Sequence, residues 1–381
     1  HNCMKNIKSI LLYFMIIMSH GVLLMADEFR WICEPKYDSI NVGLFTEYSK
    51  IPSGLIPVQF ENKYGYIDKS GNEIIKLQYQ YAGIFSEGLG LVKINDKYGF
   101  INVAGNYIVE PLYEEAKPFS DGLAAVCFNG KCGYIDKNGM MAVKNIYEEC
   151  DSFNEGYAKV KLKGKYGFIN RKGTLVIKNI FDEASRFQEE RALVIYKSSF
   201  NYIDTKGKMI SSLSFTNGNL FKENLAAVEI NDRWGFIDKN GKLAVKPLFD
   251  LVKDFSENYA AVRYNEKWGY IDSSGAFVIE NLYIFADSFY QGTAAVEDSA
   301  GLGYINKGGK FLISPQFDNA RKFINGIAPV DKASWGYVNI KGDFIIRPMF
   351  FQAMPAVEGI APVIHKGENG LKWGFIEIKN R

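Results

Sequence analysis

The chain has 381 residues, of which 47% are hydrophobic and 15% aromatic, so it can bury a sizeable core. Its 45 basic and 43 acidic side chains leave a net charge of +2 and are spread evenly along the sequence. This balance argues against a protein that tracks nucleic-acid phosphates, because such proteins usually carry a basic face or run.

The N-terminal segment has the pattern of a secretory signal. Lys5 and Lys8 form a basic start, Ile10–Met18 is an unbroken apolar run, and Ala26 ends a plausible cleavage site. We therefore expect residues 4–26 to be a signal peptide and the mature protein to be exported to the periplasm, the cell surface or the medium. An uncleaved membrane anchor is the alternative, although the apolar run is short for a bilayer span. We expect no membrane span after signal removal.

A second pattern governs the rest of the chain, beyond an irregular N-terminal segment over residues 27–54. An aromatic residue followed by glycine recurs, and from Tyr64 to Leu302 the step is 34 residues every time. A fixed step of this size is the signature of a repeat architecture. The aromatic positions of the clear copies are Tyr64, Tyr98, Tyr166, Trp234, Trp268, Trp335 and Trp373, and weaker copies stand at Cys132, Phe200 and Leu302. We expect residues 55–381 to form one repeat domain, preceded by a partial repeat.

Each repeat predicts short strands joined by turns. Tyr157–Leu162 alternates small or apolar residues with lysines, as a half-buried strand does. A glycine at a fixed point of the next turn, such as Gly241, indicates a positive φ, and the preceding Asp238 can bond the turn backbone. Two aromatics six residues apart, such as Phe249 and Phe255, predict a connector whose rings fill the seam between neighbouring repeats.

The repeat predicts an all-β fold, a tandem array of about ten three-stranded antiparallel β-meander units. Glycine turns every dozen residues argue against helical repeats of the same length. Ten units exceed the usual four to eight blades of a β-propeller, and 34 residues are few for a four-stranded blade. We therefore favour an open solenoid or superhelical array, with a closed β-propeller as the alternative.

The stretches KYGYIDKSG, KYGFINVAG, DRWGFIDKNG and EKWGYIDSSG, with flanking FSEGLGLV and PLYEEA, carry a family resemblance. The unit resembles the WG repeat, also called the KWG repeat, which is found mostly in bacterial proteins. The resemblance covers about residues 55–381. It implies all-β repeats, and it implies no catalytic residues because the shared motif contains none.

Candidate chemistry is sparse. After signal removal His365 is the single histidine, and no nucleophile motif or phosphate-binding glycine loop is present. We expect no catalytic or metal-binding residue and no cofactor. The repeated Asp and Asn residues could bind calcium, but turn formation already accounts for each of them. Four tryptophans could line a stacking surface for sugars or peptides, although core packing is favoured because tyrosines hold the same position in other repeats. These candidate binding residues are Trp234, Trp268, Trp335 and Trp373.

The cysteines allow two interpretations. Cys127 and Cys132 flank Phe-Asn-Gly-Lys, a hairpin turn in the repeat pattern, so they could face each other on paired strands. Export would permit a disulfide there. We favour the other interpretation, in which Cys132 and Cys150 fill repeat positions as small hydrophobic residues.

The functional expectation is an exported, non-enzymatic protein that offers a binding or scaffold surface to a protein or glycan partner. The alternative is a carbohydrate- or peptide-active enzyme on a β-propeller. Such an enzyme needs acidic residues that break the repeat pattern and converge on one pocket. The pattern breaks mainly at residues 188–201 and 214–223. A cell-surface spacer is a third possibility.

Overall fold

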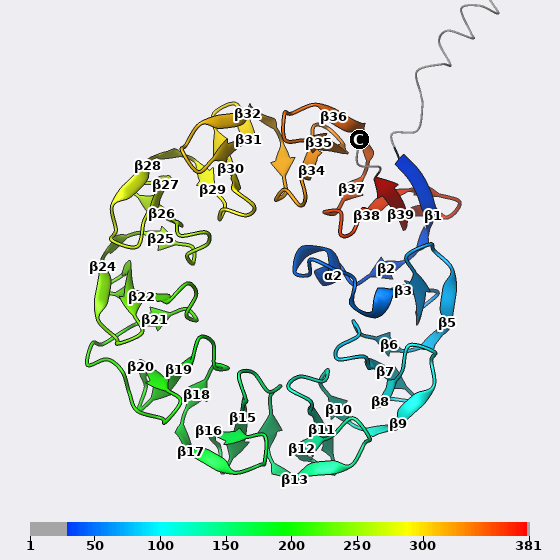
Figure 1. Cartoon of the computed structure of the whole chain (residues 1–381), viewed down its shortest axis with the longest axis vertical. Coiled ribbons are helices and arrows are strands. Elements are labelled where there is room, and N and C mark those ends of the chain that lie inside the picture. The colour runs from blue at the N-terminus through cyan, green and yellow to red at the C-terminus, as the bar shows by residue number, and fades with distance from the viewer. Residues whose placement is uncertain (1–28, 379–381) are drawn as a thin grey trace, which may run out of the picture.

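The computed structural model describes residues 29–378, which form a closed ring of ten antiparallel β-sheets, here called blades (Figure 1). Nine blades have four strands and one has three. Within the described residues the only helical turns are α2 (Gly43–Thr46) and a 3-10 turn at Pro52–Gly54. No helix of the described part is long and apolar enough to cross a membrane. The predicted signal peptide, residues 4–26, lies outside the described residues.

The strands follow one another from the opening of the ring to its rim. Blades one to five comprise β2 (Ser39–Ile40), β3 (Leu55–Phe60), β4 (Lys63–Asp68) and β5 (Glu73–Tyr79); β6 (Tyr81–Ala82), β7 (Gly90–Ile94), β8 (Lys97–Ile101) and β9 (Tyr107–Tyr113); β10 (Glu115–Ala116), β11 (Ala124–Phe128), β12 (Lys131–Ile135) and β13 (Met141–Tyr147); β14 (Glu149–Cys150), β15 (Tyr157–Leu162), β16 (Lys165–Asn170) and β17 (Leu175–Phe181); and β18 (Glu183–Ala184), β19 (Arg191–Tyr196) and β20 (Ser199–Asp204).

Blades six to ten comprise β21 (Asn217–Gly218), β22 (Leu225–Ile230), β23 (Arg233–Asp238) and β24 (Leu243–Phe249); β25 (Leu251–Val252), β26 (Ala260–Tyr264), β27 (Lys267–Ile271) and β28 (Phe277–Tyr283); β29 (Phe285–Ala286), β30 (Thr293–Asp298), β31 (Gly301–Asn306) and β32 (Phe311–Phe317); β33 (Asn319–Ala320), β34 (Ile327–Asp331), β35 (Trp335–Asn339) and β36 (Phe344–Phe350); and β37 (Gln352–Ala353), β38 (Ile360–Gly367), β39 (Gly370–Ile378) and β1 (Phe29–Tyr37).

The all-β class and the 34-residue unit are confirmed, but the unit has one more strand than the three predicted. The extra strand is the innermost one, such as β21, which has only two residues. It lies in the segment that the sequence analysis treated as a connector. Two residues carry too little alternation of apolar and polar side chains to predict a strand from sequence.

The turn before the fourth strand forms as predicted. Gly241 has a φ of +76°, and Asp238 Oδ1 accepts hydrogen bonds from the N–H groups of Asn240 and Lys242 at 2.8 and 3.0 Å. The equivalent glycines also have positive φ, namely Gly71, Gly105, Gly139, Gly173, Gly207, Gly275, Gly309 and Gly342. The repeated Asp or Asn side chains are therefore engaged by backbone N–H groups.

The glycine of the aromatic–glycine pair has a different role. Trp234 pairs with Phe249 and Phe236 pairs with Val245, so the outer strand bulges between these two positions. A Cβ on Gly235 would lie 2.5 Å from the carbonyl oxygen of Val245 and 2.7 Å from the nitrogen of Pro247. Glycine is needed there because the bulged strand lies directly over it.

Ten hydrophobic clusters hold the blades together, one in each seam between neighbours. In the seam between blades six and seven, Phe249 of one blade and Phe255 of the next belong to the same cluster. The ring of Phe255 also meets Phe236 edge-on, with centroids 4.8 Å apart. The predicted role of the two aromatics six residues apart is therefore confirmed.

The ring closes through the N-terminal strand. β1 pairs antiparallel with β39 and supplies the outer strand of the tenth blade (Figure 1). The cluster in the closing seam joins Phe375 and Tyr37 of that blade to Val58 of blade one. The structure is thus the closed, propeller-like ring that the sequence analysis gave as the alternative, in place of the open array it favoured. The partial repeat at the N-terminus is the strand that the last repeat lacks, which sequence periodicity does not reveal.

Blade five has no fourth strand. Residues 207–216 form only isolated bridges with β20, between Ile203 and Met209 and between Phe200 and Phe215. Asn201 stands where other repeats have the glycine under the bulge. A Cβ at the equivalent Gly235 would lie 2.5 Å from the outer strand, so a side chain at this position is incompatible with the bulged strand of the other blades, and Asn201 Nδ2 instead donates a hydrogen bond to the carbonyl oxygen of Ser211 at 3.4 Å.

Candidate binding surface

The four tryptophans lie in the third strand of their blades and pack in the seams. Trp268 is buried, with 9% of its surface exposed, and the other three are half-buried. The clusters that contain them belong to four separate seams. The guanidinium of Arg321 packs over the Trp335 ring, with its Cζ atom 4.8 Å from the ring centroid. The structure therefore does not bring these rings together into one continuous stacking platform.

The two faces of the ring carry different loops. The loop face has the connections between the first and second strands, and the hairpin face has the turns between the second and third strands. On the loop face a carboxylate of one blade accepts hydrogen bonds from the next blade's loop. Glu155 accepts them from the N–H groups of Glu189 and Glu190 at 2.7 and 2.8 Å, and Glu358 accepts one from Ile51 N–H at 3.0 Å across the closing seam. These recurrent acidic residues serve the assembly of the ring.

One open hollow of about 460 Å³ lies on the loop face, lined by Glu155, Tyr157, Glu190 and Thr205. It adjoins the segment where the repeat pattern breaks. Its two carboxylates are exposed, and Glu155 is engaged by the seam hydrogen bonds given above. No group of three or more histidine, cysteine or acidic residues in the described part of the chain could hold a metal ion.

His365 lies near the end of β38. Its ring contacts Trp31 and Phe350 edge-on, with centroids 6.1 and 5.8 Å apart. Its Nδ1 atom is 3.4 Å from the carbonyl oxygen of Lys366. These contacts account for His365 as a packing residue beside the closing strand.

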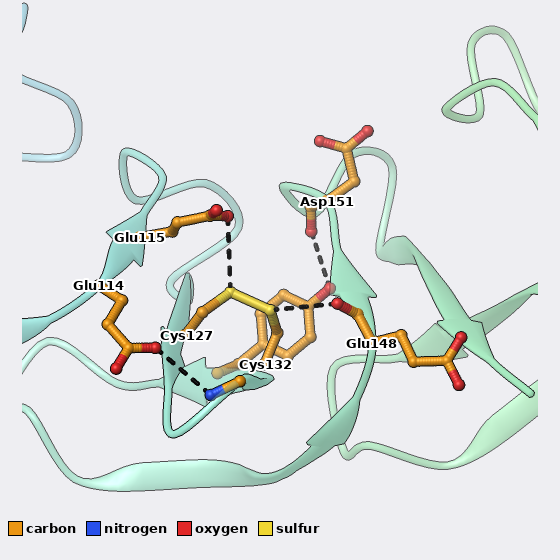
Figure 2. Close-up of a disulfide and its surroundings, with 8 residues drawn as sticks. Glu114, Glu115, Cys127, Cys132, Glu148 and Asp151 are labelled. Atoms are coloured by element: carbon orange, nitrogen blue, oxygen red, sulfur yellow. Dashed lines mark hydrogen bonds between the residues drawn. A yellow bond between two sulfur atoms is a disulfide. The ribbon is translucent and has the colours of Figure 1, made fainter. Parts of the chain in front are cut away.

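Cys127 and Cys132 form a disulfide, so the favoured interpretation of Cys132 as an unbonded small hydrophobic residue was wrong (Figure 2). The two residues lie directly opposite each other on β11 and β12, across the Asn129-Gly130 turn. Cys132 Sγ is 3.8 Å from the backbone carbonyl oxygen of Glu148, in the next blade. Cys150 and Cys33 are buried free thiols.

A variable and largely exposed feature lies at the inner edge of the hairpin face. We name these residues the inner-edge dipeptides: in each blade, the first residue of the innermost strand and the residue before it. They are Asp38-Ser39, Gln80-Tyr81, Glu114-Glu115, Glu148-Glu149, Asp182-Glu183, Thr216-Asn217, Asp250-Leu251, Ile284-Phe285, Asp318-Asn319 and Phe351-Gln352. Sequence reasoning missed them, although the contrast between PLYEEA and NLYIFA was a visible signal.

The first residue of several dipeptides stabilises its own blade. The carboxylate of Glu148 accepts hydrogen bonds from the N–H groups of Lys163 and Gly164, both at 2.9 Å. Glu114 does the same for Gly130 N–H at 3.3 Å (Figure 2). This explains why an acidic or amide residue is common there.

The second residue of the acidic dipeptides is exposed. Hydrogen bonds from Lys161 and from the Tyr166 hydroxyl, at 2.8 and 2.6 Å, hold the pKa of the Glu149 carboxyl below its usual value. Burial, together with the charges of Glu149 and Glu183, raises the pKa of Tyr166 to about 12. Among the described residues, neither Glu115 nor Glu183 has a salt bridge. Glu115 only approaches Cys127 Sγ, at 4.0 Å (Figure 2).

Comparison with known proteins identifies the repeat. The family model described as "WG containing repeat" matches residues 64–98, 98–132, 133–166, 166–196, 202–234, 234–268, 268–298, 303–333 and 335–368. No curated protein matches the sequence.

Three solved structures show how distant the structural similarity is. A eukaryotic initiation factor is 12% identical with a TM-score of 0.49, covering 83% of this chain and 96% of its own. Dihydro-heme d1 dehydrogenase NirN is 13% identical with a TM-score of 0.40, and the match covers 78% of this chain and 73% of NirN. The WD40 domain of SCAP from fission yeast is 9% identical with a TM-score of 0.35, covering 93% and 99%.

Proposed function

Because this chain belongs to the WG-containing repeat family, we propose that it is an exported, non-enzymatic protein whose ring binds a protein or glycan partner. One observation carries the proposal. The residues that recur from blade to blade build turns and seams, whereas the exposed inner-edge dipeptides differ from blade to blade. A surface that varies on a constant frame suits recognition of one particular partner.

Export is supported by two independent features. Residues 4–26 have the order of a signal peptide, and the Cys127–Cys132 disulfide suits an oxidising compartment. Mass spectrometry of the native protein should find an N-terminus near Asp27. A chain that keeps Met4 and fractionates with the cytosol would contradict export.

The binding function is tested by in-cell crosslinking of the tagged full chain, followed by reconstitution with purified components and by a glycan array. We expect one protein or one glycan class to bind reproducibly and to be recovered unchanged. Turnover of a glycan or peptide substrate by the purified chain, without such a stable complex, would instead support the enzyme alternative.

A further inference from the structure

We propose that the inner edge of the hairpin face binds a cationic, amphipathic segment of a protein partner. The basic side chains of this segment lie against blades three to five, and its apolar side chains against blades seven, eight and ten. The inference rests on the proposed binding function and adds to it the class of partner.

An acidic sector covers three consecutive blades. Their dipeptides, Glu114-Glu115, Glu148-Glu149 and Asp182-Glu183, contribute six carboxylates to one part of the inner edge. The first carboxylate of each pair bonds to a group of its own blade or of the preceding blade. Asp182, for example, forms an ion pair with Lys165 of blade four. Glu115 and Glu183 are exposed and have no salt bridge within the described residues. Glu149 is already paired with Lys161 at 2.8 Å, so the negative charge available for an incoming cation is that of Glu115 and Glu183.

An apolar sector replaces these polar residues in blades seven, eight and ten, on the other side, while blade nine between them carries Asp318-Asn319. Ile284 is 47% exposed, Phe285 37%, Leu251 45% and Phe351 66%. Lys253 Nζ covers one face of the Phe285 ring at 4.5 Å from its centroid, and the ring remains partly open. At the same positions, blades four and five carry only acidic residues, so these side chains are not required by the fold. Exposed apolar side chains gathered in this way mark interaction sites.

The two sectors face each other across the opening. In a ring of ten blades, the blade five steps away lies on the opposite side. Glu115 at the start of β10 is therefore opposite Phe285 at the start of β29, and β18 is opposite β37 (Figure 1). A bound segment meets carboxylates on one side and apolar groups on the other.

Charge and polarity together select the partner. The carboxylates repel an acidic segment. A uniformly polar segment leaves the apolar sector exposed to water. A segment with basic residues on one face and apolar residues on the other satisfies both sectors. Exposed charges at the edge of an interface contribute mainly to specificity and to the association rate. Burial of the apolar groups contributes affinity.

The probe is a fluorescent synthetic peptide of lysine and leucine, designed as a helix with all leucines on one face. Fluorescence anisotropy measures the Kd of its complex with the purified full chain. Two variants address the two sectors: E115Q/E149Q/E183Q, and I284T/F285N, which gives blade eight the dipeptide of blade six. We expect each to weaken binding about tenfold, and added salt to weaken the parent complex. A scrambled peptide and a glutamate–leucine peptide should bind far more weakly.

The matched control is E73Q/E110Q/E280Q, which removes three exposed carboxylates from the outer strands and makes the same change in net charge. It should bind the peptide like the parent. It and I284T/F285N should also melt like the parent, whereas E115Q/E149Q/E183Q loses the bonds of Glu149 to Lys161 and Tyr166 and should melt slightly lower. Equal Kd values for the parent and either sector variant would overturn the inference, as would equal weakening by the outer-strand control. Capture of the native partner by both sector variants at parental level would overturn it while leaving the proposed function intact.

Discussion

The carbonyl oxygen of Cys33 lies directly over Gly374, so that a Cβ on Gly374 would be 2.8 Å from it. In blade six the carbonyl oxygen of Val245 lies over Gly235 in the same way, at 2.5 Å from such a Cβ. A residue near the N-terminus thus takes the outer-strand position over the last aromatic–glycine pair. The closure of the ring uses the same packing rule as every other blade.

Removal of the closing strand tests this arrangement. A chain without residues 29–37 should leave the edge of β39 unpaired, because its partner strand is gone. An exposed edge strand promotes association. We expect a lower melting temperature and increased light scattering in a thermal melt. A monomeric deletion protein that melts like the parent would show that the array is stable when open.

A pair of glycine substitutions separates backbone strain from steric contact. Gly241 and Gly164 have similar φ angles, +76° and +72°. A Cβ on Gly241 would lie 2.2 Å from the carbonyl oxygen of Ile210, whereas a Cβ on Gly164 would have no atom within 4 Å. Gly164→Ala should lower the free energy of unfolding by about 1 kcal/mol, and Gly241→Ala by about 3 kcal/mol. Urea denaturation measures both. Equal losses would mean that the contact with Ile210 relaxes at no cost.

Trp234→Ala tests whether this ring serves packing or ligand stacking. The ring belongs to the seam between blades six and seven, so its loss should lower the free energy of unfolding by about 3–5 kcal/mol. Leu282→Ala, at a side chain that is 67% exposed, is the control and should change little. If Trp234→Ala instead keeps its stability and loses the partner, the stacking surface that the sequence analysis gave as the less favoured alternative is correct.

The disulfide should be detectable and modestly stabilising. Mass spectrometry after alkylation without reductant should leave Cys127 and Cys132 unmodified and linked. Because the closed loop is very short, Cys127→Ser/Cys132→Ser should cost about 2 kcal/mol of unfolding free energy or less. Reductant should lower the melting temperature of the parent and leave that of the double variant unchanged. Alkylation of both thiols in the native, unreduced protein would contradict the assignment.

The depressed pKa of Glu149 predicts an acid-sensitive contribution to stability. Hydrogen bonds from Lys161 and Tyr166 hold its folded-state pKa below the usual value of 4.5. Its contribution is therefore fully present above that value and is lost as pH falls through the lower, folded-state pKa. Melting temperatures measured from neutral to acid pH should fall further for the parent than for Glu149→Gln. Parallel curves would show that the interaction contributes nothing.

Much of the repeat could be predicted from sequence because its determinants are local. The positive φ of Gly241, the turn bonds of Asp238 and the seam position of Phe255 each depend on residues close together in the chain or one repeat away. Periodicity displays such features directly. The candidate site was not predicted, because each inner-edge dipeptide lies at the start of a two-residue strand that the pattern presented as a connector.

The sequence by itself determined the all-β class, the 34-residue unit and its turns, since short-range sterics and the alternation of apolar residues specify them. Only the tertiary structure decided that the array closes. That closure depends on the rotation between blades, set by packing in the seams, and on the pairing of Arg30 with Glu377 across nearly the whole chain. Tertiary structure also decided which inner-edge residues face each other. Glu115 lies opposite Phe285 because the ring has ten blades and is closed, and neither the number of blades nor the closure is a local property of the sequence.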